Sequence, residues 1–350
     1  MNVSRLLLCL NLLVAGPALS QGFAGLGTAA EGFAIPHPDH RLEFPMDHGA
    51  HPDFRIEWWY LTANLKDETG QSYGIQWTLF RSALAPGEAE GWQSPQIWMG
   101  HAGLTSATAH FSAERLARGG IGQAGVTTAP FQAWIDDWQM AGANDLSQLD
   151  LSAAGDSFSY ELSAKTTAPL VLQGEQGYSV KSPEGQASYY YSQPNYQIKG
   201  SLTLPSGPVD VTGDGWLDRE WSSQPLSENQ KGWDWFSLRF DNGEKLMGFV
   251  LRGANGADDF RSGTWISATG EVTPLAPGEF QAEPLAQVEV KGRSIPTRWK
   301  VDLPERNVSL IVEALNPQSW MDVAFAYWEG PVTVSGSHSG TGYLEMTGYE

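Results

Sequence analysis

Cysteine is nearly absent from this sequence: Cys9 is the only one in 350 residues. Because Cys9 lies in an apolar segment close to the N-terminus, the rest of the chain offers no thiol for a disulfide, a zinc thiolate site or a nucleophile. The signatures of a serine nucleophile elbow, a Walker phosphate loop, a dinucleotide-binding unit and an H-E-x-x-H zinc site are missing too. We therefore expect neither a cofactor nor a metal ion.

Basic residues are also scarce, with 21 Lys and Arg against 40 Asp and Glu and a formal net charge of −19. Such a balance repels phosphate backbones and anionic lipid surfaces, which argues against a nucleic acid partner. Beyond the N-terminal segment, no uncharged apolar run approaches the length of a membrane-spanning helix, and we expect no integral membrane protein. Long amphipathic helices are missing as well, although residues 112–118 could form one or two helical turns.

Residues 1–20 have the pattern of a secretory signal peptide. Arg5 supplies the positive start, residues 6–15 are apolar, and a small-x-small cleavage site ends at Ser20, just before Gln21. The apolar run is too short for a permanent membrane helix. We therefore expect a soluble protein that is periplasmic or secreted after cleavage near Ser20 and Gln21.

The remaining chain has the pattern of β-structure. Aromatic and β-branched residues at 57–65 and alternating apolar residues at 72–80 flank a turn, which is typical of a hairpin. Further short strands follow, separated by turn residues at the spacing of a sandwich or barrel.

An internal repeat divides this β-structure. The hairpin pattern returns at residue 233, and an in-order alignment pairs Trp58 with Trp233 and Tyr60 with Trp235. Such similarity indicates two β-barrels of common design. We predict an all-β fold with an irregular lead-in at 21–50, a first barrel at 51–226 and a second barrel at 227–350.

Four of the seven histidines fall in or near the lead-in, namely His37, His40, His48 and His51. They form two pairs whose spacing could chelate a metal, but the Pro and Gly residues around them provide no helix to align the rings. We expect solvated loop histidines rather than a metal site. His51 is close enough in sequence to reach Glu57.

The most unusual stretch is residues 213–221, in which acids and indoles are mixed. These side chains are Asp214, Trp216, Asp218, Glu220 and Trp221. A carboxyl beside large apolar rings loses water, which raises its pKa and makes it a candidate proton donor at neutral pH. The alternative is a turn in which Arg219 neutralises the acids and the indoles belong to the core. If the repeat is real, the stretch lies at an interface between the barrels, where ligand clefts are common.

Four motifs, which begin at Glu57, Gly215, Tyr327 and Gly342, resemble the secreted AttH-like branch of the carotenoid 1,2-hydratase family. The resemblance covers nearly the whole chain after residue 20. It implies two consecutive lipocalin-like antiparallel β-barrels with a pocket at or between them. Members of the family include hydratases that add water across a terminal isoprenoid double bond without a cofactor, and related pericyclic cyclases. The secreted branch is often labelled as a hydrolase.

The resemblance also implies site residues. The catalytic Asp of the hydratases corresponds to Asp218, and Trp216 stands where those enzymes carry Tyr. Tyr191 corresponds to part of their upstream aromatic segment. An indole in place of the Tyr hydroxyl removes a hydrogen-bond acceptor next to the acid.

Two hypotheses follow. In the first, the protein is a hydratase or isomerase for a hydrophobic isoprenoid or lipid: Asp218 protonates an alkene carbon, Glu57 or Glu220 orients water, and indoles stabilise the carbocation. Arg219 keeps one of the neighbouring acids ionised. The predicted catalytic residues are Asp218, Trp216, Glu57 and Glu220, and the predicted substrate-binding residues are Trp58, Tyr60, Tyr191, Arg219, Trp221, Trp233 and Trp235. In the second, the protein is a non-catalytic lipocalin-like lipid carrier that serves an envelope transporter.

Overall fold

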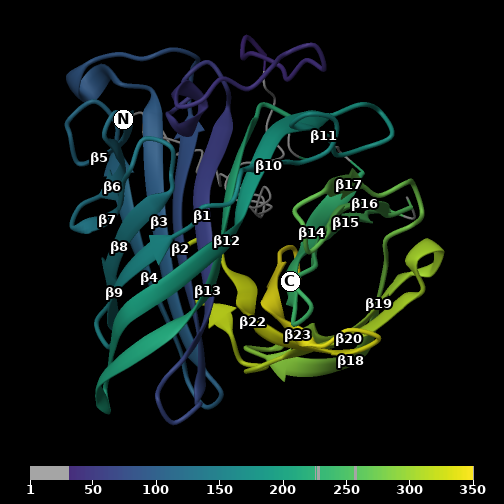
Figure 1. Cartoon of the computed structure of the whole chain (residues 1–350). Coiled ribbons are helices and arrows are strands. Elements are labelled where there is room, and N and C mark those ends of the chain that lie inside the picture. The colour runs from purple at the N-terminus through teal and green to yellow at the C-terminus, as the bar shows by residue number, and fades with distance from the viewer. Residues whose placement is uncertain (1–30, 225, 227–228, 256–257, 350) are drawn as a thin grey trace, which may run out of the picture.

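The computed structural model describes residues 31–349 except 225, 227, 228, 256 and 257. The predicted signal peptide and the first part of the lead-in lie outside the described residues. Within them, the chain forms two antiparallel sheets that lie side by side (Figure 1). The prediction of an all-β fold is confirmed.

The first sheet contains thirteen of the described strands. They are β1 (Ile56–Lys66), β2 (Ser72–Ala83), β3 (Gln96–Ser106), β4 (His110–Arg118), β5 (Ala124–Thr128), β6 (Phe131–Ile135), β7 (Trp138–Gly142), β8 (Gln148–Ala154), β9 (Ser159–Lys165), β10 (Val171–Leu172), β11 (Tyr178–Val180), β12 (Ala187–Leu204) and β13 (Gly207–Ser222). Their order is β4-β3-β2-β1-β13-β12-β9-β8-β7-β6-β5, and the sheet curls into a nearly closed barrel (Figure 1). The segment 112–118, for which helical turns were considered, belongs to strand β4.

The second sheet contains ten of the described strands. They are β14 (Gln230–Phe240), β15 (Lys245–Gly253), β16 (Phe260–Ile266), β17 (Val272–Pro274), β18 (Gln281–Val290), β19 (Arg293–Leu303), β20 (Val308–Ala314), β21 (Trp320–Met321), β22 (Tyr327–Gly336) and β23 (Gly340–Met346). Their order is β17-β16-β15-β14-β23-β22-β20-β19-β18, with β21 on β22. This sheet forms an open half-barrel rather than a second closed barrel (Figure 1).

Three short 3-10 helices connect described strands or precede them: η2 (Met46–His48), η3 (Gly91–Gln93) and η4 (Pro304–Arg306). Helix η2 belongs to the lead-in and packs on the first barrel, where the His48 ring is fully buried and its Nδ1 lies 2.6 Å from the Tyr191 hydroxyl. His37 and His40 are exposed, as expected for loop histidines. The expectation of a solvated ring is wrong for His48, because the lead-in folds back onto strand β12. It is wrong for His51 too, because that side chain is only 16% exposed and its ring stacks on Trp221.

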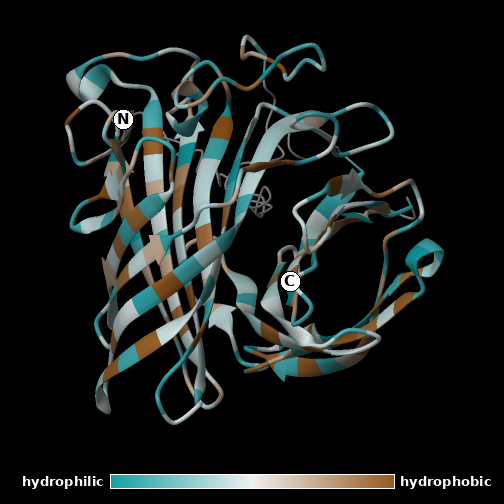
Figure 2. Ribbon diagram, viewed as in Figure 1, coloured by the Kyte–Doolittle hydropathy of each residue, from teal (hydrophilic) through white to brown (hydrophobic). Residues whose placement is uncertain are grey.

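Alternation along the strands gives each sheet two chemically different faces (Figure 2). On β1, Trp59 and Leu61 point into the core of the first barrel, whereas Trp58 and Tyr60 point outward toward the second sheet. Strand β13 continues the pattern, because Tyr60 pairs in register with Asp218. The side chain of Asp218 therefore lies on the outward face of the first barrel.

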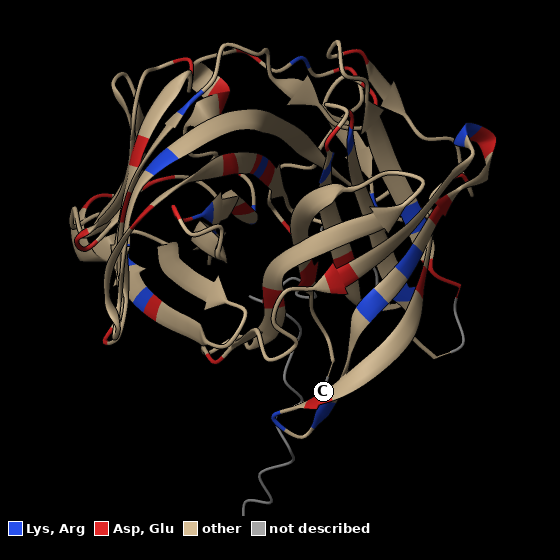
Figure 3. Cartoon of the chain, turned by 60° about the horizontal axis from the view of Figure 1, so that its bottom comes forward, with Lys and Arg blue, Asp and Glu red and all other residues tan. Residues whose placement is uncertain are grey.

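A third core cluster joins the two sheets. Tyr60, Tyr190 and Trp216 of the first sheet pack there with Trp235 and Phe249 of the second. Because both contributing faces are aromatic, a polar group at their junction loses much of its contact with water. Asp and Glu residues otherwise spread over both units of the molecule (Figure 3).

Candidate active site

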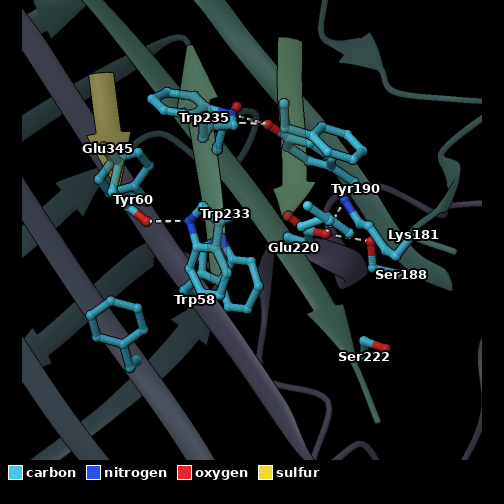
Figure 4. A pocket seen from close by; sticks show the side chains of 14 residues that line it. Trp58, Tyr60, Lys181, Ser188, Tyr190, Glu220, Ser222, Trp233, Trp235 and Glu345 are labelled. Carbon is cyan, nitrogen blue, oxygen red and sulfur yellow. Dashed lines mark hydrogen bonds and ion pairs between the residues drawn. The ribbon is translucent and has the colours of Figure 1, made fainter. Parts of the chain in front are cut away.

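A pocket lies at the junction of the two sheets (Figure 4). It contains about 750 Å³ of empty space, including the part that is open to solvent. Its apolar wall comes from the aromatic residues Trp58, Phe80, Trp233, Trp235 and Phe249. Its polar groups include Lys181, Ser188, Asp218, Glu220 and Glu345. A flat apolar ligand with one polar part fits this lining.

Asp218 lies in this wall with its side chain almost completely buried, at 2% exposure. Three neutral donors reach its carboxyl: the Ser192 hydroxyl and the Trp216 indole N–H donate to Oδ1, and the Tyr190 hydroxyl donates to Oδ2. The Trp216 bond measures 2.8 Å, and so does the Tyr190 bond. Trp235 in turn donates its indole N–H to the Tyr190 hydroxyl at 3.1 Å.

Burial raises the pKa of Asp218 to about 7, against the lowering effect of its three hydrogen bonds. Within the described residues, no Lys, Arg or His forms an ion pair with this carboxyl. Glu220 adds a second raising effect through its own charge. The carboxyl is therefore divided between its acid and its base form near neutral pH, as a general acid requires.

Glu220 lies two residues further along the same face of β13 and has a different environment. The Lys181 ammonium lies 2.7 Å from Glu220 Oε1, and the Ser188 hydroxyl donates to the same oxygen. The Lys181 nitrogen also lies 4.9 Å from the ring centroid of Tyr190 and 4.4 Å from that of Phe249. Lys181 thus combines an ion pair with cation–π contacts at the polar part of the pocket.

Glu345, on β23, is a second acid of the pocket. The Trp233 indole donates its N–H to Glu345 Oε1 at 2.7 Å, as Figure 4 shows. Burial raises the pKa of Glu345 to about 7, and the charge of Asp218 adds to this effect. The pocket therefore holds two carboxyls that both exchange a proton near neutral pH.

The predicted site residue Glu57 is on the inner face of β1, away from this pocket. Its carboxyl accepts a hydrogen bond from Arg81 Nε, lies 3.2 Å from Arg219 Nη2, and lies 3.0 Å from His51 Nδ1. The charges of Arg81, His51 and Arg219 hold its pKa below the usual range in spite of complete burial. His51 thus does reach Glu57, as its position suggested, and its other ring nitrogen lies 3.1 Å from Asp47.

The other predicted residues fall into two groups, according to the face of the sheet from which their side chains project. Seven face the junction: Trp58, Tyr60, Trp216, Asp218, Glu220, Trp233 and Trp235. Arg219, Trp221 and Tyr191 point into the first barrel with Glu57. There the Trp221 ring stacks on His51 at 4.0 Å between centroids, and Arg219 lies over Trp59. We correct the expectation that these four side chains stand beside Asp218, because neighbours along a strand point to opposite faces.

Several site residues were missed by the sequence reasoning. Tyr190 and Glu345 belong to motifs that were noticed, but nothing in the sequence alone singled out these positions. Ser192 ends the stretch that resembles the family's upstream aromatic segment, but its contact with Asp218 depends on the long-range pairing of β12 with β13. Lys181 reaches the site from a loop, and no sequence pattern points to it. Within residues 31–349, apart from the five that are not described, no group of three or more His, Cys, Asp or Glu is arranged to hold a metal ion. In the same part of the chain, no helix is long and apolar enough to span a membrane.

Comparison with known proteins finds matches that cover most of the chain. A family model described as AttH-like matches residues 35–349. A crystal structure of an AttH protein, NE1406 from Nitrosomonas europaea, is 32% identical, with a TM-score of 0.81 over 91% of this chain and 100% of that one. None of the curated proteins compared with the chain matches it.

Two more distant solved structures share the fold. Kievitone hydratase from Nectria haematococca is 15% identical, with a TM-score of 0.67 over 93% of this chain and 96% of that one. CghA, solved with Sch210972, is 12% identical, with a TM-score of 0.57 over 93% of this chain and 98% of that one. At these identities the likeness concerns the fold.

Proposed function

The chain belongs to the AttH-like family, and from this premise we propose that it is a cofactor-independent hydratase or isomerase for a hydrophobic isoprenoid or lipid substrate. The observation that carries the proposal is Asp218, a buried carboxyl in the wall of an aromatic pocket that has no cation partner among the described residues. The shared fold of kievitone hydratase, a hydratase by its name, supports the same reaction class.

In the proposed first step, neutral Asp218 gives its proton to one carbon of an alkene. The π electron pair forms the new C–H bond, and the neighbouring carbon becomes a carbocation. Asp218 is then a carboxylate, and the donors Ser192, Tyr190 and Trp216 stabilise that charge without moving. Trp216 acts only as a donor in this step, because an indole nitrogen has no lone pair to accept a proton.

The aromatic wall stabilises the carbocation. Trp58, Trp233 and Trp235 line the same pocket as Asp218, and a desolvated cation over an indole face gains about 2 kcal/mol. Water that attacks the cation gives hydration, and loss of a proton from an adjacent carbon gives isomerisation. Glu220 is held by Lys181 and Ser188 at the polar part of the pocket, where it can orient water or a polar substrate group.

The second candidate function is a non-catalytic lipid carrier. One observation favours it: both oxygens of Asp218 already accept hydrogen bonds from protein donors. If these bonds hold in every state, the carboxyl is a structural group and the pocket binds its ligand without chemistry.

Deuterium incorporation distinguishes the two candidates. The protein is incubated in D2O with a series of isoprenoid alcohols from dimethylallyl alcohol to geranylgeraniol, and products are analysed by mass spectrometry. A protonation step places one deuterium on carbon, and Asp218→Asn should reduce its rate at least 100-fold, since general acid catalysis contributes about 10²–10⁴-fold. Asp214→Asn is the matched control, because Asp214 lies on the same strand but at the surface. Binding without deuterium uptake by the wild type would favour the carrier.

We further propose that the protein is exported, on the evidence of residues 1–20 alone. N-terminal sequencing of the protein from its own cell envelope should start near Gln21. A chain that retains Met1 in the cytoplasm would contradict this.

A further inference from the structure

A second group of buried acids lies behind the pocket, and the proposed protonation step does not use it. Glu345 opens onto the pocket, and Glu329, on β22, lies deeper between the two sheets. Glu329 is 1% exposed, and burial together with the charge of Glu345 raises its pKa well above the usual range. A neutral carboxyl in this position can both donate and accept a proton.

Tyr60 connects these two acids. Its hydroxyl donates a hydrogen bond to Glu329 Oε1, and it also interacts with the Glu345 carboxyl. Tyr60 stands on β1 of the first sheet, whereas both acids stand on the second sheet. The contact therefore crosses the junction beside the pocket wall.

The contacts continue from Glu329 to the protein surface. The Tyr327 hydroxyl interacts with the Glu329 carboxyl and lies 3.1 Å from His101 Nδ1. His101 Nε2 lies 3.2 Å from Glu114 Oε1. His101 is completely buried, but the Glu114 side chain on β4 is 22% exposed and reaches solvent.

One assignment of hydrogens makes every donor point outward. Burial lowers the pKa of His101, so its ring is neutral. If its Nε2–H donates to Glu114, then Nδ1 accepts from the Tyr327 hydroxyl, and the neutral Glu329 carboxyl donates to Tyr327. Among the described residues the Glu329 Oε2 atom is buried and has no hydrogen-bond partner, so it is the carboxyl oxygen that is free to carry the proton.

We propose that Glu345 is a second acid–base group of the pocket and that a proton relay connects it to solvent. The relay members, in order, are Tyr60, Glu329, Tyr327, His101 and Glu114. The relay is a property of the folded protein alone, whereas its part in catalysis rests on the proposed function.

The relay completes the proton balance of hydration. Water forms a C–O bond with the carbocation and loses one proton, which ionised Glu345 accepts. Each relay member then passes a proton one step outward, and Glu114 releases one to solvent. Asp218, which gave its proton to carbon, takes up one proton from water at the pocket mouth. The net reaction is the addition of one water to one alkene.

Infrared spectroscopy tests the relay without a substrate. The carbonyl band of protonated Glu329 is assigned by its loss in Glu329→Gln, and its shift on deuteration is followed after mixing into D2O. We expect exchange within seconds in the wild type, although the carboxyl is buried, and at least tenfold slower exchange in Tyr327→Phe. The matched control is Tyr196→Phe, a buried tyrosine inside the first barrel whose hydroxyl donates to the Leu146 carbonyl, which should exchange as the wild type does.

His101→Gln provides a second interruption of the relay if Tyr327→Phe does not fold, and it should slow the exchange in the same way. Wild-type exchange as slow as that of core amides would overturn the relay, and so would unchanged exchange in a folded Tyr327→Phe or His101→Gln. These outcomes are independent of the deuterium incorporation that tests Asp218, so failure of one proposal is distinguishable from failure of the other.

Discussion

Glu57 and Asp218 stand on adjacent paired strands, and both carboxyls are almost completely buried, at 0% and 2% exposure. Glu57 faces the interior of the first barrel, and Asp218 faces the junction with the second sheet. Their pKa values move in opposite directions: that of Glu57 is lowered, and that of Asp218 is raised to about 7.

Burial raises the pKa of both acids, so burial does not explain the difference. Glu57 has two guanidinium groups, Arg81 and Arg219, within ion-pair distance. In the part of the chain that the structure describes, only neutral groups donate to Asp218. A buried acid therefore becomes a candidate proton donor where no cation lies close enough to lower its pKa.

The largest expected effect comes from breaking the inner site. Glu57→Gln leaves Arg81 and Arg219 buried without their counterion, which costs about 3–5 kcal/mol of stability. Urea unfolding at pH 7 measures this change. Glu220→Gln serves as the control, because Glu220 has one cation partner, Lys181, and its loss should cost less. A loss below about 1 kcal/mol in Glu57→Gln would show that the inner ion cluster does not anchor the barrel.

A smaller and pH-dependent effect is expected at the pocket. Above an unfolded pKa near 3.8, the unfolded chain releases the Asp218 proton while the folded protein retains it up to about pH 7. Stability due to this group therefore falls as the pH rises between those values, by about 1.4 kcal/mol per pH unit. Asp218→Asn removes this dependence. The stability of Asp218→Asn relative to the wild type should therefore increase by about 2–4 kcal/mol between pH 4 and pH 8.

Urea unfolding of both proteins across this pH range gives the measurement. The contribution of Glu57 has the opposite sign, since its lowered pKa stabilises the fold above about pH 4.5 and is lost on acidification. It is present in both proteins and cancels in their difference. A stability difference that does not change with pH would contradict the raised pKa of Asp218.

The smallest expected effect is a change in the pKa of Asp218 when one of its hydrogen-bond donors is removed. Ser192→Ala removes one of the three donors that favour ionised Asp218. Because a hydrogen bond to a charged group contributes about 1.5–3 kcal/mol, the pKa of Asp218 should rise further, by about one to two units. A carboxyl titration of this variant measures the shift. A lower pKa would mean that the hydroxyl does not stabilise the carboxylate.

Much of the fold could be predicted from local pattern. The hairpin beginning at Glu57 and its repeat at Trp233 became β1–β2 and β14–β15, and the aligned residues Trp58 and Trp233 line one pocket. The acid and indole pattern also identified Asp218. These features depend on residues close in sequence, which alternation and turn chemistry describe well.

The remaining part of the site depends on contacts between residues far apart in the sequence, which a local sequence pattern cannot predict. Tyr60 and Glu329 are 269 residues apart and meet only because the two sheets pack face to face. The separation of Glu57 from Asp218 follows from the register of β1 on β13, which pairs Glu57 with Trp221. A register shift of one residue would have moved each side chain of one strand to the opposite face of the sheet. The sequence of a single strand does not determine this register.

The most direct test of the account is a 13C NMR titration of side-chain carboxyls, with Asp218 assigned by the loss of its signal in Asp218→Asn. We expect the Asp218 carboxyl to titrate with a midpoint near pH 7 and Glu57 to remain ionised down to pH 4. An Asp218 carboxyl that is already fully ionised at pH 5 would contradict its role as the proton donor of the pocket.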